Sequence, residues 1–208
     1  MWFCEDGTKI AFIKFNETLV EEYHLQYYMK DSGKSYPSDM ALKYPKPGSP
    51  NPIVSFYISD LSDSSKPGYA HLVELEDPKL FTPEDTIITQ VSWYTNESLL
   101  LRIMNRVQDH QKIYLVELDK GKWVGTLIRD EPTPDGSWYN WRSPLTVIKT
   151  HTEEATNPAY VEIRENEQGY AHLAYYKDAS QVSPTFWLTK GEWEITSVSS
   201  FDSVRNIL

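Results

Sequence analysis

The sequence predicts an all-β protein, and three observations support this. The chain of 208 residues carries 7 Trp, 14 Tyr and 7 Phe, and aromatic side chains pack well on pleated sheets. Short runs of β-branched and aromatic residues recur along it, separated by turn residues. No long window has the apolar period of an amphipathic helix. The predicted strands are Ile10–Phe15, Ile53–Ile58, Ala70–Leu75, Ile87–Trp93, Leu99–Ile103, Lys112–Leu118, Lys122–Ile128, Leu145–Lys149, Ala159–Ile163, Ala171–Tyr176, Thr185–Leu188 and Ile195–Val198.

The first two strands are separated by an unusually long connection. Ile10–Phe15 follows an Asp6-Gly7 pair, which favours a tight turn because glycine accepts positive φ. Ile53–Ile58 follows Lys43–Pro52, whose prolines hold the backbone extended and lead it into the strand. Ordinary connections have about 2–6 residues. The whole of Tyr23–Pro52 is therefore predicted to form an inserted arm with a role of its own.

The middle of the chain has a repeated strand, turn and strand rhythm. Lys112–Leu118 ends in Asp119-Lys120-Gly121 and turns back into Lys122–Ile128, as hairpins do. A Trp-led strand, a polar turn and an apolar run occur at Trp2–Phe12 and again at Trp93–Leu101. A repeat of about 45–50 residues suits a propeller blade, and the chain would hold roughly four such units. An ordinary β-sandwich would produce most of the same local signals.

The last third of the chain continues the same pattern. Leu145–Lys149, Ala159–Ile163 and Ala171–Tyr176 are short and rich in β-branched or aromatic residues. A Lys190-Gly191 pair then separates the last two predicted strands, and glycine there favours a turn. These segments predict a further sheet.

Composition and charge argue against several classes of protein. Acidic residues outnumber basic ones by 30 to 20, giving a formal charge of −10 without a basic run, so the surface would repel nucleic acid. Cys4 is the only cysteine, which leaves no disulfide within the chain. No apolar run approaches the roughly 18 residues that span a bilayer. Both ends of the chain look like cuts through secondary structure, so it is expected to be a fragment.

Several motifs occur in an order and at spacings that resemble those of one family. Tyr44–Pro52 resembles the Tyr-Pro-Lys-x-Gly-x-x-Asn-Pro segment in the propeller of the dipeptidyl peptidase IV family of serine peptidases. Each further motif is weak evidence when taken alone. All of them occur in the family's order and at similar spacings, so the resemblance extends through nearly the whole chain. The further matching segments are Met1–Phe12, Phe15–Thr18, Val91–Trp93, Asn166–Leu173 and Leu188–Ile195.

The resemblance implies an open part of a β-propeller, roughly four blade-equivalents of four-stranded antiparallel sheets over residues 1–208. In this family the propeller caps an α/β-hydrolase domain, which is expected to lie outside this chain. The parent enzyme would release N-terminal dipeptides of the Xaa-Pro or Xaa-Ala type, and the propeller would gate and position the peptide. Two alternatives remain: a catalytically inactive relative that serves as an interaction or channel-auxiliary subunit, and an unrelated β-rich binding module.

The resemblance also implies partners and a location. The parent would bind peptides with a free N-terminus, would need no cofactor and would form a homodimer through the Tyr23–Pro52 region. It would be a single-pass type II membrane protein, with this region outside the cell or in the lumen of the secretory pathway or vacuole. Nucleic acid is not an expected partner.

Catalytic residues are not expected in this chain. A serine peptidase of this family needs a Gly-x-Ser-x-Gly elbow followed by Asp and His, and no glycine here begins such a motif. The five histidines are scattered without metal-ligand spacing. The family's paired glutamates would precede Met1, so Glu21-Glu22 and Glu153-Glu154 are interpreted as solvated pairs. The isolated chain is therefore predicted to have no peptidase activity.

One loop is a candidate for contact with substrate. Ser137–Arg142 lies where the family has a loop that lines the path to the active site, which makes Trp138, Trp141 and Arg142 the candidates. Aromatic rings and a guanidinium can hold a peptide by stacking and charge. Alternatively, these aromatics pack into a sheet edge. Asn16 and Asn96 begin sequons for N-glycosylation, and the family has a sequon at the turn that matches Asn16.

Overall fold

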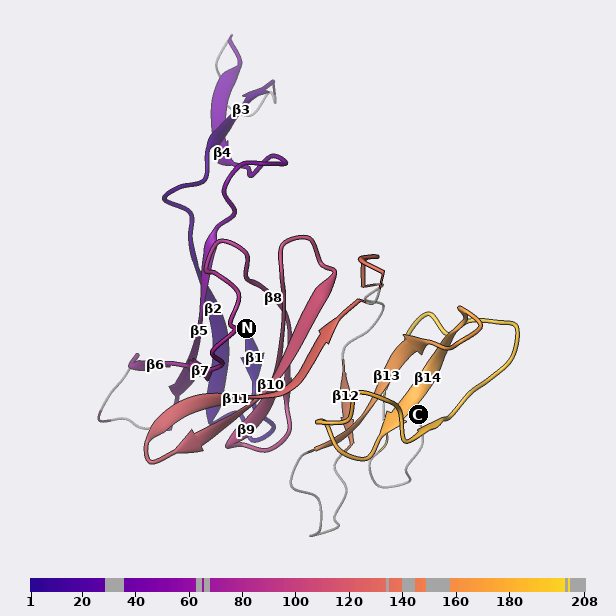
Figure 1. Ribbon diagram of the computed structural model, residues 1–208. Coiled ribbons are helices and arrows are strands. Elements are labelled where there is room, and N and C mark those ends of the chain that lie inside the picture. The colour runs from indigo at the N-terminus through magenta and orange to yellow at the C-terminus, as the bar shows by residue number, and fades with distance from the viewer. Residues whose placement is uncertain are drawn as a thin grey trace.

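The computed structural model describes residues 1–28, 36–62, 65, 68–133, 135–139, 145–148, 158–200 and 202. These residues form strands and connections arranged in four sheets (Figure 1). Three sheets have four or five strands, and the fourth is a two-stranded hairpin that stands away from the others. Within the described part of the chain no sheet closes on itself. The predicted all-β fold with open sheets is confirmed.

The first sheet has the order β1-β2-β5-β6 and is antiparallel throughout. A turn around Gly7, whose φ is +72°, joins the first two strands, as the Asp-Gly pair predicts. Buried side chains on β2 and β5 include Ala11, Phe56 and Ile58, which face the second sheet. The strands are β1 (Trp2–Phe3), β2 (Lys9–Asn16), β5 (Ile53–Asp60) and β6 (Ala70–Leu72).

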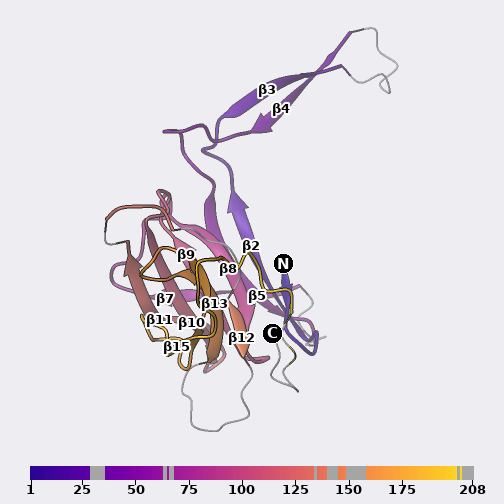
Figure 2. The same ribbon diagram turned by 90° about the vertical axis from the view of Figure 1, so that its right-hand side faces the viewer.

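An arm is inserted between β2 and β5, as the long connection predicts. It consists of β3 (Glu22–Tyr27) and β4 (Ser38–Lys43), which pair antiparallel. The arm extends beyond the ends of β2 and β5, away from the three larger sheets (Figure 2). All but one of its strand residues are exposed. The sequence does not predict these strands, because their apolar and polar residues alternate without the β-branched residues typical of buried strands.

The second sheet has the order β7-β11-β10-β9-β8. The chain crosses to it from the first sheet at Val73, so the predicted strand Ala70–Leu75 is divided between two sheets. Lys120 and Gly121, with φ of +48° and +83°, form a two-residue hairpin turn between β10 and β11. Among the described strands of this sheet, β7 pairs with β11 in parallel and the other pairs are antiparallel. The strands are β7 (Glu74–Glu76), β8 (Ile87–Trp93), β9 (Ser98–Met104), β10 (His110–Asp119) and β11 (Lys122–Pro132).

The third sheet has the order β12-β13-β14-β15 and is antiparallel. The predicted strand Ile195–Val198 is wrong, because those residues form no strand. They follow a loop at Gly191, and Ile195 returns to donate one backbone hydrogen bond to Ala171. The Ile195 and Val198 side chains still pack on the sheet. The strands are β12 (Thr146–Ile148), β13 (Ala159–Glu165), β14 (Ala171–Tyr176) and β15 (Phe186–Trp187).

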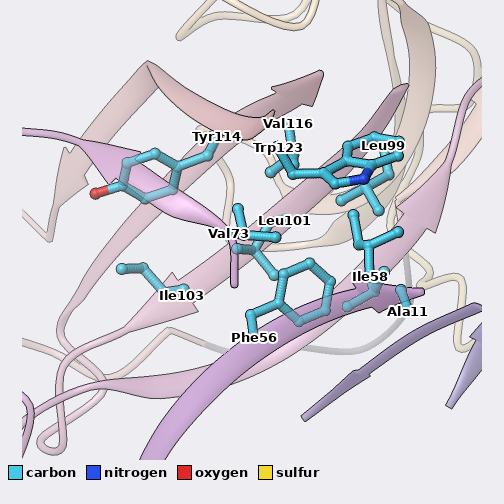
Figure 3. Packing of buried hydrophobic residues seen from close by; sticks show 11 residues of the cluster. Ala11, Phe56, Ile58, Val73, Leu99, Leu101, Ile103, Tyr114, Val116 and Trp123 are labelled. Atoms are coloured by element: carbon cyan, nitrogen blue, oxygen red, sulfur yellow. The ribbon is translucent and has the colours of Figure 1, made fainter. Parts of the chain in front are cut away.

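Apolar clusters lie between neighbouring sheets. Phe56 and Ile58 from the first sheet meet Leu99, Leu101 and residues of neighbouring strands from the second (Figure 3). Another cluster joins Leu100 and Leu115 of the second sheet to Tyr160 of the third. The sheets thus pack face to face, as blades of a propeller do. No helix in the described ranges is long and apolar enough to cross a membrane.

Candidate functional site

The candidate loop follows β11 and carries one strongly exposed aromatic residue. Trp138 is 77% exposed, so its ring is not packed into a sheet edge. The next residue, Tyr139, is half-buried. Trp141 and Arg142 lie outside the described residues. Trp138 is therefore the candidate whose surroundings can be described.

Two backbone hydrogen bonds attach this loop to the turn between β9 and β10. Thr133 N donates to Asp109 O over 2.8 Å, and Tyr139 N donates to Gln108 O over 2.9 Å. Gln108 has a φ of +66°, a left-handed conformation that is uncommon for a residue other than glycine. The side chain of Asn105 spans the turn by accepting hydrogen bonds from the backbone N–H groups of Asp109 and His110. The backbone of the loop is thus hydrogen-bonded to a turn that the Asn105 side chain spans.

Beside this loop, five charged side chains form a buried network between the second and third sheets. Glu162 lies between two arginines, 2.5 Å from Arg102 Nη2 and 3.2 Å from Arg129 Nη2. Glu131 lies 3.1 Å from both Arg129 Nε and Arg164 Nη1. The side chains of Arg102, Arg129, Glu131 and Glu162 are at most 8% exposed. We call these five residues the seam network.

Two tyrosine rings pack against Arg129 of the seam network. Tyr160 and Tyr176 stack with centroids 4.6 Å apart, and the Arg129 guanidinium lies 5.6 Å and 5.3 Å from their centres. Arg129 also donates a hydrogen bond to the Tyr160 hydroxyl. Burial, together with the negative charge of Glu131, raises the pKa of Tyr139 to about 12. These phenols stay protonated at neutral pH, so the network is charged only through its arginines and glutamates.

We expect the seam network to make folding stability depend on acid pH. Burial opposes ionisation of Glu162, but Arg102, Arg129 and Arg164 together hold its pKa below the ordinary 4.5. The other titratable groups near Glu162 are Tyr160, Tyr176 and Glu131. A lowered folded-state pKa means that this stabilisation is complete above about pH 4.5 and is lost as pH falls through the folded value. Thermal midpoints measured between about pH 7 and pH 3 should fall only in the acid range. In a Glu162→Gln variant, the thermal midpoint should fall less over the same pH range than it does in the wild type.

Each of the four described histidines contacts another residue of the chain. His172 is fully buried, with Nε2 2.9 Å from Gly191 O and Nδ1 3.1 Å from Thr189 Oγ1. His110 pairs with Asp130, and His24 pairs with Asp39 on the arm. His71 stacks edge-on against Tyr69, and His151 lies outside the described residues. Within the described ranges no three His, Cys, Asp or Glu side chains gather as metal ligands would.

The two sequons differ in their surroundings. Asn16 is exposed at the end of β2, and its side-chain oxygen accepts hydrogen bonds from Thr18 N and Oγ1. Asn96 Nδ2 instead donates to Asp6 Oδ2 over 2.6 Å, which links a turn of the second sheet to one of the first. Ser98 of that sequon is only 6% exposed. Of the two acidic pairs, Glu21-Glu22 is exposed and Glu22 forms a surface ion pair with Lys43, whereas Glu153-Glu154 lies outside the described residues.

Sequence reasoning did not identify the seam network. Its signal is a charged residue between apolar neighbours in a predicted strand, as in Leu101-Arg102-Ile103 and Val161-Glu162-Ile163. Such a residue is either turned to solvent or paired in the interior. Only the packing of the two sheets shows that these residues meet each other.

Comparisons with known proteins agree with this architecture. Residues 1–208 match the family described as the dipeptidyl peptidase IV (DPP IV) N-terminal region. A probable dipeptidyl-aminopeptidase B of Penicillium rubens is 34% identical over 96% of this chain and 22% of its own length. A probable dipeptidyl peptidase 4 of Aspergillus flavus is 34% identical over 100% of this chain and 26% of its own length.

A solved structure shows the same fold. Dipeptidyl peptidase 4 of Porphyromonas gingivalis superposes with a TM-score of 0.69 over 97% of this chain and 25% of that one, at 24% sequence identity. The chain thus spans about a quarter of the length of the relatives that it matches. Because the family match covers the whole chain, the chain belongs to the dipeptidyl peptidase IV family and corresponds to its N-terminal region.

Proposed function

We propose that the full-length protein is a serine-type dipeptidyl peptidase that releases N-terminal dipeptides of the Xaa-Pro or Xaa-Ala type. Residues 1–208 would be a partial propeller domain that gates and positions the peptide, while acyl transfer would occur in an α/β-hydrolase domain outside this chain. The observation that carries this proposal is the family match over the whole chain, together with the peptidase names of its fungal relatives. No cofactor is required by this chemistry.

The first test is turnover by the full-length protein. A Gly-Pro or Ala-Pro chromogenic substrate should be cleaved, and replacement of the elbow serine in the hydrolase domain should abolish cleavage. A folded full-length protein without turnover would instead favour a catalytically inactive relative that acts as an interaction or channel-auxiliary subunit. Residues 1–208 alone should release no product.

In the loop after β11, we propose that Trp138, Trp141 and Arg142 contact the peptide. The high exposure of Trp138 supports this, because its ring is free to stack on a bound peptide. We expect Trp141→Ala combined with Arg142→Ala to raise KM while kcat and the thermal midpoint stay near wild type, since binding shared by ground and transition states is lost. A lower thermal midpoint would show that these side chains are packing residues. Unchanged kinetics would place the loop away from the substrate.

The arm is proposed to contribute to a homodimer through the Tyr23–Pro52 region. The cross-strand pairs Tyr23–Leu42 and Leu25–Met40 place apolar side chains on one face of the hairpin, and each is at least 38% exposed. The other face carries polar pairs, including His24–Asp39. An exposed apolar face next to a polar one is typical of an interaction surface.

We expect deletion of Asp31–Ser38 from the full-length protein to shift it toward monomer in sedimentation velocity. A finer variant, Leu25→Glu, places a charge on the apolar face and should have the same effect, because burying an unpaired charge is costly. His24→Gln, on the opposite face, is the matched control and should leave the dimer intact. A dimer that survives both the deletion and Leu25→Glu would contradict this role.

The location of the full-length protein is proposed from the same relationship. We place it as a single-pass type II membrane protein with this region outside the cell or in the lumen of the secretory pathway or vacuole. Asn16 is the better of the two candidate glycosylation sites, because it is exposed, whereas the Asn96 amide is bonded to Asp6 and Ser98 of its sequon is buried.

A further inference from the structure

We propose that Tyr139 and the turn Asn105–His110 are positioning elements that hold Trp138 in its outward orientation for peptide binding. This inference rests on the proposed contact between Trp138 and the substrate. It assigns a role to residues that are proposed to act through the loop and not by contact with the peptide. The feature that supports it is that two residues of the loop, Thr133 and Tyr139, are hydrogen-bonded to the same turn.

The backbone of the loop is attached at two points to that turn. Thr133 N bonds to Asp109 O at the start of the loop, and Tyr139 N bonds to Gln108 O next to Trp138. Within the loop, Ser137 N donates to Asp135 Oδ1 over 3.0 Å, which closes a small turn. The hydrogen bond of Tyr139 N fixes the peptide bond that joins residues 138 and 139, and this restricts the direction in which the Trp138 side chain leaves the backbone. A long exposed side chain thereby loses less freedom when it binds.

The turn holds a conformation that its sequence does not favour locally. Gln108 presents its carbonyl to Tyr139 N from a left-handed backbone, where a side chain is crowded. Asn105 maintains this geometry: its Oδ1 accepts from Asp109 N over 3.2 Å and from His110 N over 3.1 Å. Its Nδ2 donates to Asp109 Oδ1 over 2.6 Å, and its carbonyl accepts from Gln108 N over 3.0 Å. A residue in a sparsely populated conformation persists only where its surroundings enforce it.

The two neighbouring side chains of the loop, Trp138 and Tyr139, differ in exposure. It is half-buried, while the adjacent Trp138 is 77% exposed, so the two side chains point to different sides of the backbone. The raised pKa of Tyr139, which burial and Glu131 cause, agrees with a phenol lying beside the seam network. Glu131 itself is held by ion pairs with Arg129 and Arg164 and by a hydrogen bond from Gln111.

The test is a double-mutant cycle on the full-length peptidase with a chromogenic dipeptide substrate. Trp138→Ala and Tyr139→Ala should each raise KM by a similar factor, about threefold to tenfold, with kcat within about twofold of wild type. The double variant should have the KM of Trp138→Ala alone, because Tyr139 acts through that ring. Tyr139→Phe keeps the ring and should restore the wild-type KM. Asn105→Ala should also raise KM in the wild-type background. Added to Trp138→Ala, it should raise KM no further.

The outcomes separate this inference from the proposed function. If Trp138→Ala leaves KM unchanged, the substrate contact is wrong and the positioning role is overturned with it. If Trp138→Ala raises KM but Tyr139→Ala and Asn105→Ala do not, only the positioning role is overturned. Multiplicative effects in the double variant would also overturn it, since they indicate independent contacts. If Tyr139→Ala does not fold, Asn105→Ala decides by the same comparison.

Discussion

Glu162→Gln is expected to lower the free energy of unfolding by about 3–5 kcal/mol, because it removes one partner from a buried ion pair. Glu162 bonds Arg102 from β9 and Arg129 from β11, and all three side chains are at most 8% exposed. Glutamine fills the same space but cannot balance two buried guanidinium charges. Arg129 would keep its ion pair with Glu131, but Glu162 is the only acidic partner of Arg102 within the described residues, so the substitution would leave the Arg102 guanidinium buried without a counter-charge.

The matched control for this substitution is Glu74→Gln. Glu74 pairs with Lys122 at 3.5 Å, but the two side chains are 60% and 69% exposed. Exposed pairs contribute at most about 1 kcal/mol, so this variant should unfold almost as the wild type does. The two variants and the wild type are compared by their midpoints of chemical denaturation. A loss below about 1 kcal/mol for Glu162→Gln would contradict the assignment of a buried, coupled network.

Asp77→Asn should have a comparable effect at a second buried charge, about 3–5 kcal/mol. Asp77 Oδ2 accepts from Lys112 Nζ over 2.6 Å and from Tyr114 Oη over 2.7 Å, and the Lys112 side chain is only 1% exposed. The substitution would leave the Lys112 ammonium buried without a close counter-charge. Within the described residues, the only other hydrogen-bond acceptor of the Lys112 ammonium is the neutral backbone carbonyl of Lys79, 2.6 Å away.

Asp130→Asn is the control for this second site. Asp130 lies 4.0 Å from the same ammonium group and is 39% exposed, so solvent screens its charge. We expect a loss below about 1 kcal/mol for Asp130→Asn. Asp77 also ties the segment between β7 and β8 to β10, so hydrogen exchange of the β10 amides should rise in Asp77→Asn. Equal effects of the two substitutions would show that Asp77 is not the main partner of Lys112.

The strands were predictable from sequence because their signals are local. Alternation of apolar and polar residues predicts Ile53–Ile58, observed as β5, and a short run that includes aromatic residues predicts Ala171–Tyr176, observed as β14. The Asp119-Lys120-Gly121 turn predicts the hairpin between β10 and β11. The same local signals fail at the arm strands, which bury nothing, and at Ile195–Val198, whose apolar residues pack on a sheet without joining it.

The sequence by itself determined the fold class, the inserted arm and the family, since short strands, turn residues and ordered motifs are all read along the chain. Only the tertiary structure decided which charged residues meet, because Arg102 and Glu162 are distant in sequence and pair only when two sheets pack face to face. It also decided that Trp138 is exposed while the adjacent Tyr139 is half-buried. Side-chain exposure depends on what covers a residue, and that cover comes from strands elsewhere in the chain.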